Sequence, residues 1–180
     1  RTAGRRRHPP AGDRRIGVDL AASVAPFLLA LSLLEDCRHW CRLALQALDE
    51  RDLGSTLELA LQEALATALM YGSGNGDEVR RTYERALEIA AGQGVASRHL
   101  QLLTGYYTFH SRRGDFRGSL SAARRRRHIT RRIDEPEETA QTEWLLAVSL
   151  HLIGRQAAAR RHCEAAFANA AHIVKHRFVI

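Results

Sequence analysis

A pattern that recurs about every forty residues limits what this chain can fold into more than any other feature of its sequence. The pattern occurs in four segments, which span residues 35–45, 77–87, 116–126 and 155–166. When the four segments are aligned, one position near their ends is occupied in turn by Ala44, Ala86, Arg126 and Ala166. These residues are 42, 40 and 40 positions apart. The positions three and seven residues earlier hold mostly small side chains, such as Cys41 and Cys37 in the first segment. Residues at these spacings share one face of an α-helix, and small side chains there let a neighbouring helix approach closely.

The segments between these four also have helical periodicity, so we expect the chain to consist of helix pairs. Apolar periodicity predicts the first helix of each pair over about residues 18–34, 55–71, 97–112 and 137–153. Gly114 and Gly154 stand just past two of these helices, where glycine commonly ends a helix, and Asp134 with Pro136 marks the start of the last one. No stretch alternates as a β-strand does. The sequence therefore predicts an all-α fold, in which about four helix-turn-helix units with a period of about 40 residues stack into an α-solenoid.

Composition and charge agree with a globular helical domain. Of the 180 residues, 45% are hydrophobic and 26% are charged, a balance that excludes wholesale disorder. The net charge of +7 comes from arginine, because Lys175 is the only lysine, and several arginines lie within residues 1–15. We expect residues 1–15 to form a basic, disordered segment. Residues 16–180 are then one repeat domain, a fragment of a longer chain.

The apolar run at residues 16–34 is expected to be a buried core helix rather than a signal peptide or a membrane span. Asp19 and Pro26 interrupt it, and acidic residues follow it where small residues would mark a cleavage site. The three cysteines cannot pair completely, and none lies in a Cys-x-x-Cys motif. This cysteine usage favours a reduced, cytoplasmic environment. The interrupted apolar run leads us to expect no membrane association.

The second helices of the pairs resemble those of the tetratricopeptide (TPR) repeat family. At four positions of its second helix, the TPR motif has alanine, an aromatic residue, alanine and leucine. In the stretch DEVRRTYERALEIA, the corresponding residues are Val79, Tyr83, Ala86 and Leu87. The run Gly114-Asp115-Phe116 matches the Gly-Asp-Tyr turn of the motif. The period of about 40 residues exceeds the usual 34, so the resemblance implies a divergent, TPR-like branch.

A wider resemblance covers about residues 16–178. The stretches SLLEDCRHWCRLALQAL, GSGNGDEVRRTYERALEIA and SLHLIGRQAAARRHCE are similar to the C-terminal region of bacterial predicted ATPases. Those signal-transducing NTPases carry a winged-helix or helix-turn-helix DNA-binding domain. The phosphate-binding motif G-x-x-x-x-G-K-[ST] is absent from this chain, and its glycine-rich loop at residues 72–76 has no lysine. The resemblance therefore implies a sensor or interaction arm, with nucleic acid contacted only by domains outside this chain.

No set of residues in the sequence has the pattern of a catalytic, metal or cofactor site. Residues of metal-ligand type occur at Cys37, His39, Cys41, His162 and Cys163, but a structural zinc site needs four convergent ligands. The repeat register turns the cysteines toward neighbouring helices, so we expect them to be small buried side chains. The two histidines are expected to be solvated or capping residues. We expect no enzyme activity, no metal and no cofactor.

The run Arg124-Arg125-Arg126-Arg127 is the strongest electrostatic feature of the sequence. Four successive arginines, at about 100° per residue, cover most of the circumference of a helix, so at least one points toward neighbouring helices. Arg126 holds the small-residue position, and we expect it to lie along the interface or to pair with a carboxylate of the next helix start. The basic patch of Arg124 to Arg127 is otherwise expected to be a solvated, ion-paired face. The alternative is a surface that binds phosphate groups of nucleic acid or a nucleotide.

The TPR resemblance also implies a binding groove, because the first helix of each TPR unit lines the concave side of the array. The groove positions of the motif fall on Tyr71, Thr104, Thr108, Arg112, Trp144, Val148 and His151. Within each helix they recur every three or four residues, as one face requires. An aromatic side chain with a few polar groups suits a peptide or a small anionic effector. Trp144 and Val148 are alternatively part of the core between repeats.

Two classes of function remain open from the sequence. The first is a non-catalytic sensor or protein-interaction module that serves signal transduction and transcription regulation, with a variant in which the module belongs to a nucleotidyl cyclase. The second is a basic α-solenoid that binds nucleic acid directly. Uncovered apolar surface at the ends of the array also leads us to expect self-association, which light scattering over a range of protein concentrations tests.

Overall fold

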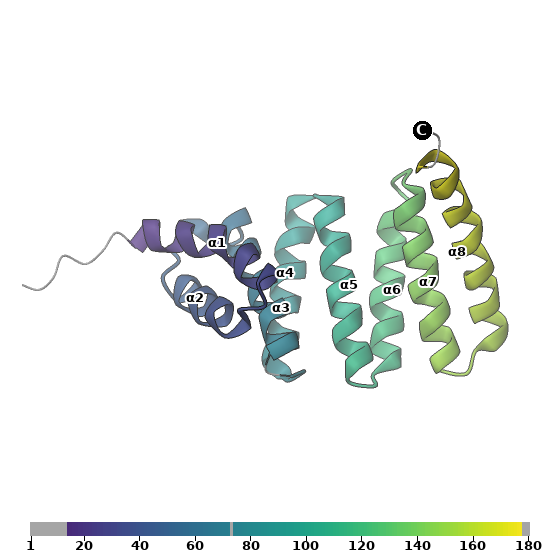
Figure 1. Cartoon of the computed structure of the whole chain (residues 1–180), viewed down its shortest axis with the longest axis horizontal. Helices are drawn as coiled ribbons and strands as arrows, with labels where there is room; N and C mark the ends of the chain where they lie inside the picture. Colours follow the sequence, from purple (N-terminus) through teal and green to yellow (C-terminus); the bar gives the residue numbers. More distant parts are fainter. Residues whose placement is uncertain (1–13, 73, 178–180) are drawn as a thin grey trace, which may run out of the picture. The chain divides into compact units, whose positions relative to one another are not determined.

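The computed structural model describes residues 14–72 and 74–177, with side chains described as far as residue 171. All regular structure in these ranges is helical (Figure 1), which confirms the all-α prediction. The chain divides into two compact units, residues 1–74 and 75–180, and each is described by itself. The first unit contains α1 (Arg14–Ala30), α2 (Leu34–Gln46), the short 3-10 helix η1 (Glu50–Asp52) and α3 (Thr56–Gly72). The second contains α4 (Asp77–Gln93), α5 (Ala96–Arg112), α6 (Phe116–Thr130), α7 (Pro136–Leu152) and α8 (Gln156–Arg177).

The turn between α5 and α6 shows how the sequence ends one helix and starts the next. Gly114 has a φ of 73°, in the left-handed region that favours glycine. The N–H of Asp115 donates to the carbonyl of His110 at 3.0 Å, which closes the end of α5. The Asp115 carboxylate then accepts a hydrogen bond from the N–H of Gly118 at 2.9 Å, which caps α6 and lowers the pKa of Asp115.

Helix α1 begins earlier than the sequence pattern predicted. The prediction placed this helix at residues 18–34 and left residues 1–15 in a disordered segment, most of which lies outside the described residues. Arg15 lies in the first turn of α1, and its guanidinium pairs with Asp19 at 3.1 Å, one turn further along α1, and with Asp52 of η1 at 2.8 Å. The basic residue therefore joins α1 to η1 instead of belonging to a separate segment.

Helix α1 also ends earlier than predicted, at a turn built on serine. Ser32 has a φ of 58°, and the N–H of Leu33 donates to the carbonyl of Leu28 at 2.8 Å. This is the hydrogen-bond pattern that usually ends a helix at glycine. A serine in that place gives no signal in the sequence, so the apolar run predicts one helix as far as residue 34.

The apolar surface of α1 is only partly covered within the first unit. Three of its side chains, Val18, Ala21 and Ala25, are buried, and α1 packs against α2 and α3. The other face exposes large apolar side chains at every third or fourth position, namely Ile16, Leu20, Val24 and Phe27, and Leu31 in the turn after the helix is exposed as well. The prediction of a buried core helix is wrong for this face, because the described elements of the unit cover α1 on one side only. Such a face favours the expected self-association.

The small-residue positions of the repeat pattern lie on the packing faces of the second helices. Cys37, Cys41 and Ala44 are buried, and so are the equivalent residues of α4, α6 and α8, except that Cys163 is half-buried. The Sγ atoms of Cys37 and Cys41 lie 4.0 Å apart, and both thiols are free. The hydrogen bond with Cys37 and burial raise the pKa of Cys41, so this thiol stays protonated. Burial, which was expected for the cysteines, is confirmed for these two.

Helices α4 and α5 approach closely where Tyr83 meets Gly105. A Cβ atom placed on Gly105 would lie 2.6 Å from the Tyr83 hydroxyl oxygen, well inside van der Waals contact. The Tyr83 side chain is buried, and its ring centroid lies 5.9 Å from that of Tyr106 and 6.5 Å from that of Phe109. Gly105 therefore provides the space in which the aromatic cluster of these two helices packs.

A buried arginine joins α5, α6 and α7. Arg126 is 1% exposed, which confirms that it points inward from its small-residue position. Its Nε donates to the hydroxyl of Thr142 at 2.9 Å. Its Nη1 donates to the carbonyl of Leu100 at 2.7 Å and to the hydroxyl of Thr104 at 2.8 Å. One side chain of α6 is thereby bonded to both neighbouring helices.

The same guanidinium forms an ion pair with the start of α7. Nη2 of Arg126 donates to the carboxylate of Glu138 and to Gln141 Oε1. All five N–H groups of the guanidinium therefore have acceptors. The expected pairing with a carboxylate of the next helix start is confirmed. Burial lowers the pKa of Arg126, with Glu138 opposing that shift, but an arginine keeps its charge at any ordinary pH.

We expect Gly105→Ala to lower the free energy of unfolding by about 1–3 kcal/mol, because the added methyl group displaces the buried Tyr83. Gly92→Ala is the matched control. Gly92 lies in α4, where a Cβ would meet no atom within 4 Å, so the gain in helix propensity should raise stability by about 0.5–1 kcal/mol. Denaturant titration measures both changes, and equal effects at the two positions would contradict the close packing.

Arg126→Ala is expected to lower the free energy of unfolding by about 3–5 kcal/mol, because it removes a buried cation that bonds three helices and leaves the partly buried Glu138 carboxylate without its counter-charge. The neighbouring Arg125 is exposed and makes no ion pair with a described residue, so Arg125→Ala should change stability by less than about 0.5 kcal/mol. The measurement is denaturant unfolding of both variants followed by circular dichroism. A loss below about 1 kcal/mol for Arg126→Ala would show that the network does not hold the helices together.

Candidate functional site

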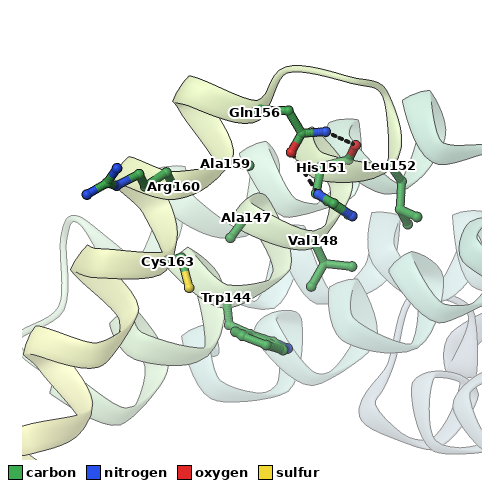
Figure 2. Close-up of a pocket in the computed structure, with 9 residues that line it drawn as sticks. All are labelled: Trp144, Ala147, Val148, His151, Leu152, Gln156, Ala159, Arg160 and Cys163. Atoms are coloured by element: carbon green, nitrogen blue, oxygen red, sulfur yellow. Dashed lines mark hydrogen bonds between the residues drawn. The ribbon is translucent and has the colours of Figure 1, made fainter.

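Helices α7 and α8 leave a cavity of about 370 Å³ between them, beside the turn that joins them (Figure 2). Its lining is mostly apolar. The residues that line it are Trp144, Ala147, Val148, His151, Leu152, Gln156, Ala159, Arg160 and Cys163. A cavity of this volume accommodates a large side chain or a small ligand.

The apolar part of the cavity is built around one half-exposed tryptophan. The side chain of Trp144 is 51% exposed, although it belongs to a well-packed helix pair. Cys163 lines the same cavity from α8 (Figure 2). Ala147 and Ala159 are buried, and their small side chains leave the space beside the indole open. An exposed indole next to unfilled space is the kind of surface that anchors a partner side chain.

The end of the cavity near the turn is polar. The Nε2 of Gln156 donates to the backbone carbonyl of His151 at 3.3 Å, which fixes the Oε1 of the same amide as an acceptor. His151 Nδ1, 2.8 Å from that Oε1, is therefore a donor, and in the neutral ring the Nε2 atom is an acceptor. Arg160 points away from Trp144 (Figure 2), and its Nε pairs with Glu164 at 2.8 Å.

Three of the seven residues predicted to line a groove are brought together in this cavity. Trp144, Val148 and His151 all line it from one face of α7, as their spacing predicted. The alternative that Trp144 belongs to the core between repeats does not hold for its indole, half of which is exposed.

The other four predicted groove residues lie elsewhere. The hydroxyl of Thr104 belongs to the Arg126 network, and the hydroxyl of Thr108 donates to the Thr104 carbonyl at 3.0 Å. Arg112 is exposed in the last turn of α5, and Tyr71 is exposed on α3, in the first unit. Both threonine hydroxyls are therefore engaged inside the fold, and none of these four residues lines the α7–α8 cavity.

One wall of the cavity comes from α8, a helix that carries none of the predicted groove residues. Ala159 and Cys163 stand seven and three residues before Ala166, and small side chains at these positions predict only close helix packing. The same small side chains leave the space that Trp144 faces. The signal was present in the sequence, but it does not distinguish a filled interface from an open one.

A second cavity, of about 420 Å³, lies where the start of α4 meets the turn between α5 and α6. Its lining is more polar, and its charges already pair with one another. Arg113 lies 3.8 Å from Asp77, and His110 lies 2.8 Å from Asp115. A ligand there would have to compete with these pairs, so the cavity is a weaker candidate than the one between α7 and α8.

The predicted basic patch is divided between the surface and the interior. Arg124 and Arg125 are exposed and Arg127 is half-buried, whereas Arg126 belongs to the buried network. The ion pairing expected for this face is not found: no described carboxylate pairs with the three surface arginines. Helix α6 contains no acidic residue, and the nearby Glu138 already pairs with Arg126.

The residue types that were considered as metal ligands have other roles. Nδ1 of His162 lies 2.5 Å from a carboxylate oxygen of Glu143 on α7, and His39 is exposed. Among the described side chains, those of residues 14–72 and 74–171, no three of His, Cys, Asp or Glu come together as a metal ion would require. Within residues 14–72 and 74–177, no helix combines the length and the hydropathy needed to cross a membrane.

Comparisons with known proteins add no family to this description. A comparison with protein-family models gives no match to any part of the chain. A comparison with curated proteins gives no match either. The function therefore has to be argued from the cavity, the surface charges and the fold.

Proposed function

We propose that this chain is a non-catalytic helical-repeat module that binds a protein or peptide partner through the α7–α8 cavity. In this proposal the module is the regulatory arm of a longer, cytoplasmic protein, a signal-transducing ATPase that regulates transcription. The cavity is the observation that carries the proposal. The state of the cysteines supports the cytoplasmic part, since Cys37, Cys41 and Cys163 are all free.

The order of the helices supports a repeat array of TPR-like type. The first helices α3, α5 and α7 begin at Thr56, Ala96 and Pro136, which keeps the period of 40 residues. The second helices α4, α6 and α8 begin at residues 77, 116 and 156. Helix pairs repeated at a constant spacing are typical of α-solenoids, which bind partners along extended surfaces.

The chemistry of the cavity favours a peptide with one apolar anchor side chain. Trp144 and Val148 offer an apolar surface that an aromatic or branched aliphatic side chain would cover. His151 provides a ring nitrogen that accepts a hydrogen bond from a backbone N–H or a hydroxyl beside that anchor. No charged group of the cavity lacks a partner, because Arg160 pairs with Glu164, so the anchor itself needs no charge.

Selection from a displayed library of random peptides tests this proposal. We expect enriched peptides to share an aromatic or aliphatic anchor, and Trp144→Ala to weaken their binding by about tenfold or more, as loss of a central tryptophan contact does. Trp40→Ala is the matched control, because Trp40 is 52% exposed on α2 and lines none of the cavities described. Fluorescence anisotropy of labelled peptides measures both effects.

The reactivity of Cys163 provides a second readout of the same site. Cys163 is half-buried and lines the cavity, whereas Cys37 and Cys41 are 0% exposed. A thiol reagent should therefore modify Cys163 first, and a bound peptide should protect it. Peptides that bind equally well to the parent chain and to Trp144→Ala, or that leave Cys163 unprotected, would place binding elsewhere and contradict the proposal.

A further inference from the structure

Helix α6 carries a row of arginines whose charge nothing in the described structure neutralises. We call this row the arginine ridge, and it consists of Arg117, Arg124, Arg125, Arg127, Arg131 and Arg132. All are exposed except Arg127, which is half-buried, and the last two lie in the turn just after the helix. No ion pair joins any of them to a residue that the structure describes.

Several arginines on α4 and α8 pair with a carboxylate of their own helix, whereas Arg81 and Arg161 are exposed and make no ion pair with a described residue. Arg80 pairs with Glu84 at 3.0 Å, Arg85 pairs with Glu88 at 2.9 Å, and Arg160 pairs with Glu164 at 2.8 Å. Each pair joins residues three or four positions apart on one helix, as helix geometry allows. The arginines within α6 have no such partners, because residues 116–133 contain no aspartate or glutamate, and Asp134 and Glu135 form no described ion pair with Arg131 or Arg132. The charge of the arginine ridge is therefore available to a ligand.

The position of Arg126 shows which way the arginine ridge faces. Arg126 points into the interior, and residues two positions before and after it lie about 200° away around the helix. Arg124 and His128 are therefore on the outward side, together with Arg117, which is seven positions before Arg124. At 1.5 Å per residue, the line from Arg117 to the end of α6 is about 20 Å long. Arg117, Arg124 and Arg131 therefore form a straight, outward-facing row, with Arg125 and Arg132 on one flank and Arg127 on the other.

We propose that the arginine ridge binds the phosphate backbone of a nucleic-acid duplex, independently of base sequence. A row of guanidinium groups matches a ligand whose anionic groups are also arranged in a row, and a duplex carries about one charge per 1.7 Å of its axis. The planar guanidinium also binds a phosphate through two parallel hydrogen bonds.

Two features favour a duplex over other polyanions. Single strands are held by stacking of bases on exposed aromatic rings, and α6 exposes no large aromatic side chain. An acidic peptide presents flexible, isolated carboxylates, which lose more conformational entropy than a rigid duplex when they align along a straight row. This ridge is separate from the α7–α8 cavity, whose lining it does not share. Both surfaces can therefore act in one molecule.

The test is binding of a fluorescent DNA duplex of about 20 base pairs, measured by anisotropy at several salt concentrations between about 50 and 200 mM. The triple variant Arg117→Ala, Arg124→Ala, Arg131→Ala should lose about tenfold or more in affinity. It should also lower the slope of log K against log salt by about three, since each phosphate contact contributes about 0.9. Single substitutions at these residues should each lower the slope by about one, so the result does not depend on the triple variant folding.

The matched control is the triple variant Arg80→Ala, Arg85→Ala, Arg160→Ala, which removes the same charge from arginines that are already paired. It should change affinity by less than about threefold. Trp144→Ala should leave duplex binding unchanged, which separates this proposal from the peptide site. The same measurement with an RNA duplex of equal length shows whether the arginine ridge binds the phosphate backbone of DNA or that of RNA more tightly.

Four outcomes would overturn the proposal. The first is that the parent chain binds no duplex at low salt. The second is that both triple variants weaken binding equally, which would show that binding depends only on the net charge of the protein. The third is that a poly-glutamate peptide competes as well per charge as the duplex, which would assign the ridge to acidic proteins. The fourth is that a single strand of the same length binds more tightly than the duplex, which would assign recognition to exposed bases.

Discussion

The hydrogen bonds of one buried guanidinium fix how α5, α6 and α7 lie together, and both candidate surfaces depend on that arrangement. Because a buried cation tolerates no missing partner, the helix faces that carry Thr104 and Thr142 must meet Arg126. On α7, Trp144 follows Thr142 by two positions and lies about 200° away around the helix. Fixing Thr142 toward α6 therefore turns Trp144 to the opposite side, where the cavity forms. On α6, the same network uses the carboxylate of Glu138 and leaves the arginine ridge without a counter-charge.

Parts of the fold that local interactions determine could be predicted from the sequence. The turn at Gly114 and Asp115 needs only a left-handed residue and a capping carboxylate, and both can be recognised in a sequence. The helical spacing of small residues likewise identified the faces that are buried. The end of α1 could not be predicted, because Ser32 adopts a conformation that serine rarely takes. The exposure of Leu20 and Phe27 could not be predicted either, because it depends on which elements pack against α1 rather than on α1 itself.

The candidate site was predictable to the extent that it lies on one helix. Trp144, Val148 and His151 lie on one face of α7 however that helix packs against its neighbours. Their spacing in the sequence is therefore enough to predict that they line one surface. The contribution of α8 depends on how far two helices separate, and small residues such as Cys163 are compatible both with close packing and with a cavity. The loss of Thr104 from the groove has the same origin. Its hydroxyl is engaged by a side chain 22 residues away, and single-helix periodicity contains no information on such a contact.

The cavity and the arginine ridge select ligands through different forces, and this difference allows both to belong to one unit. An apolar anchor beside Trp144 gains free energy by leaving water, and added salt does not weaken that gain. A polyanion on the ridge gains free energy by releasing counterions, and salt weakens it strongly. The one arginine at the cavity, Arg160, is paired with Glu164, so the cavity offers a polyanion little attraction. The ridge in turn offers no apolar surface to a peptide anchor. The distribution of carboxylates, present on α8 and absent from α6, therefore keeps the two surfaces chemically distinct.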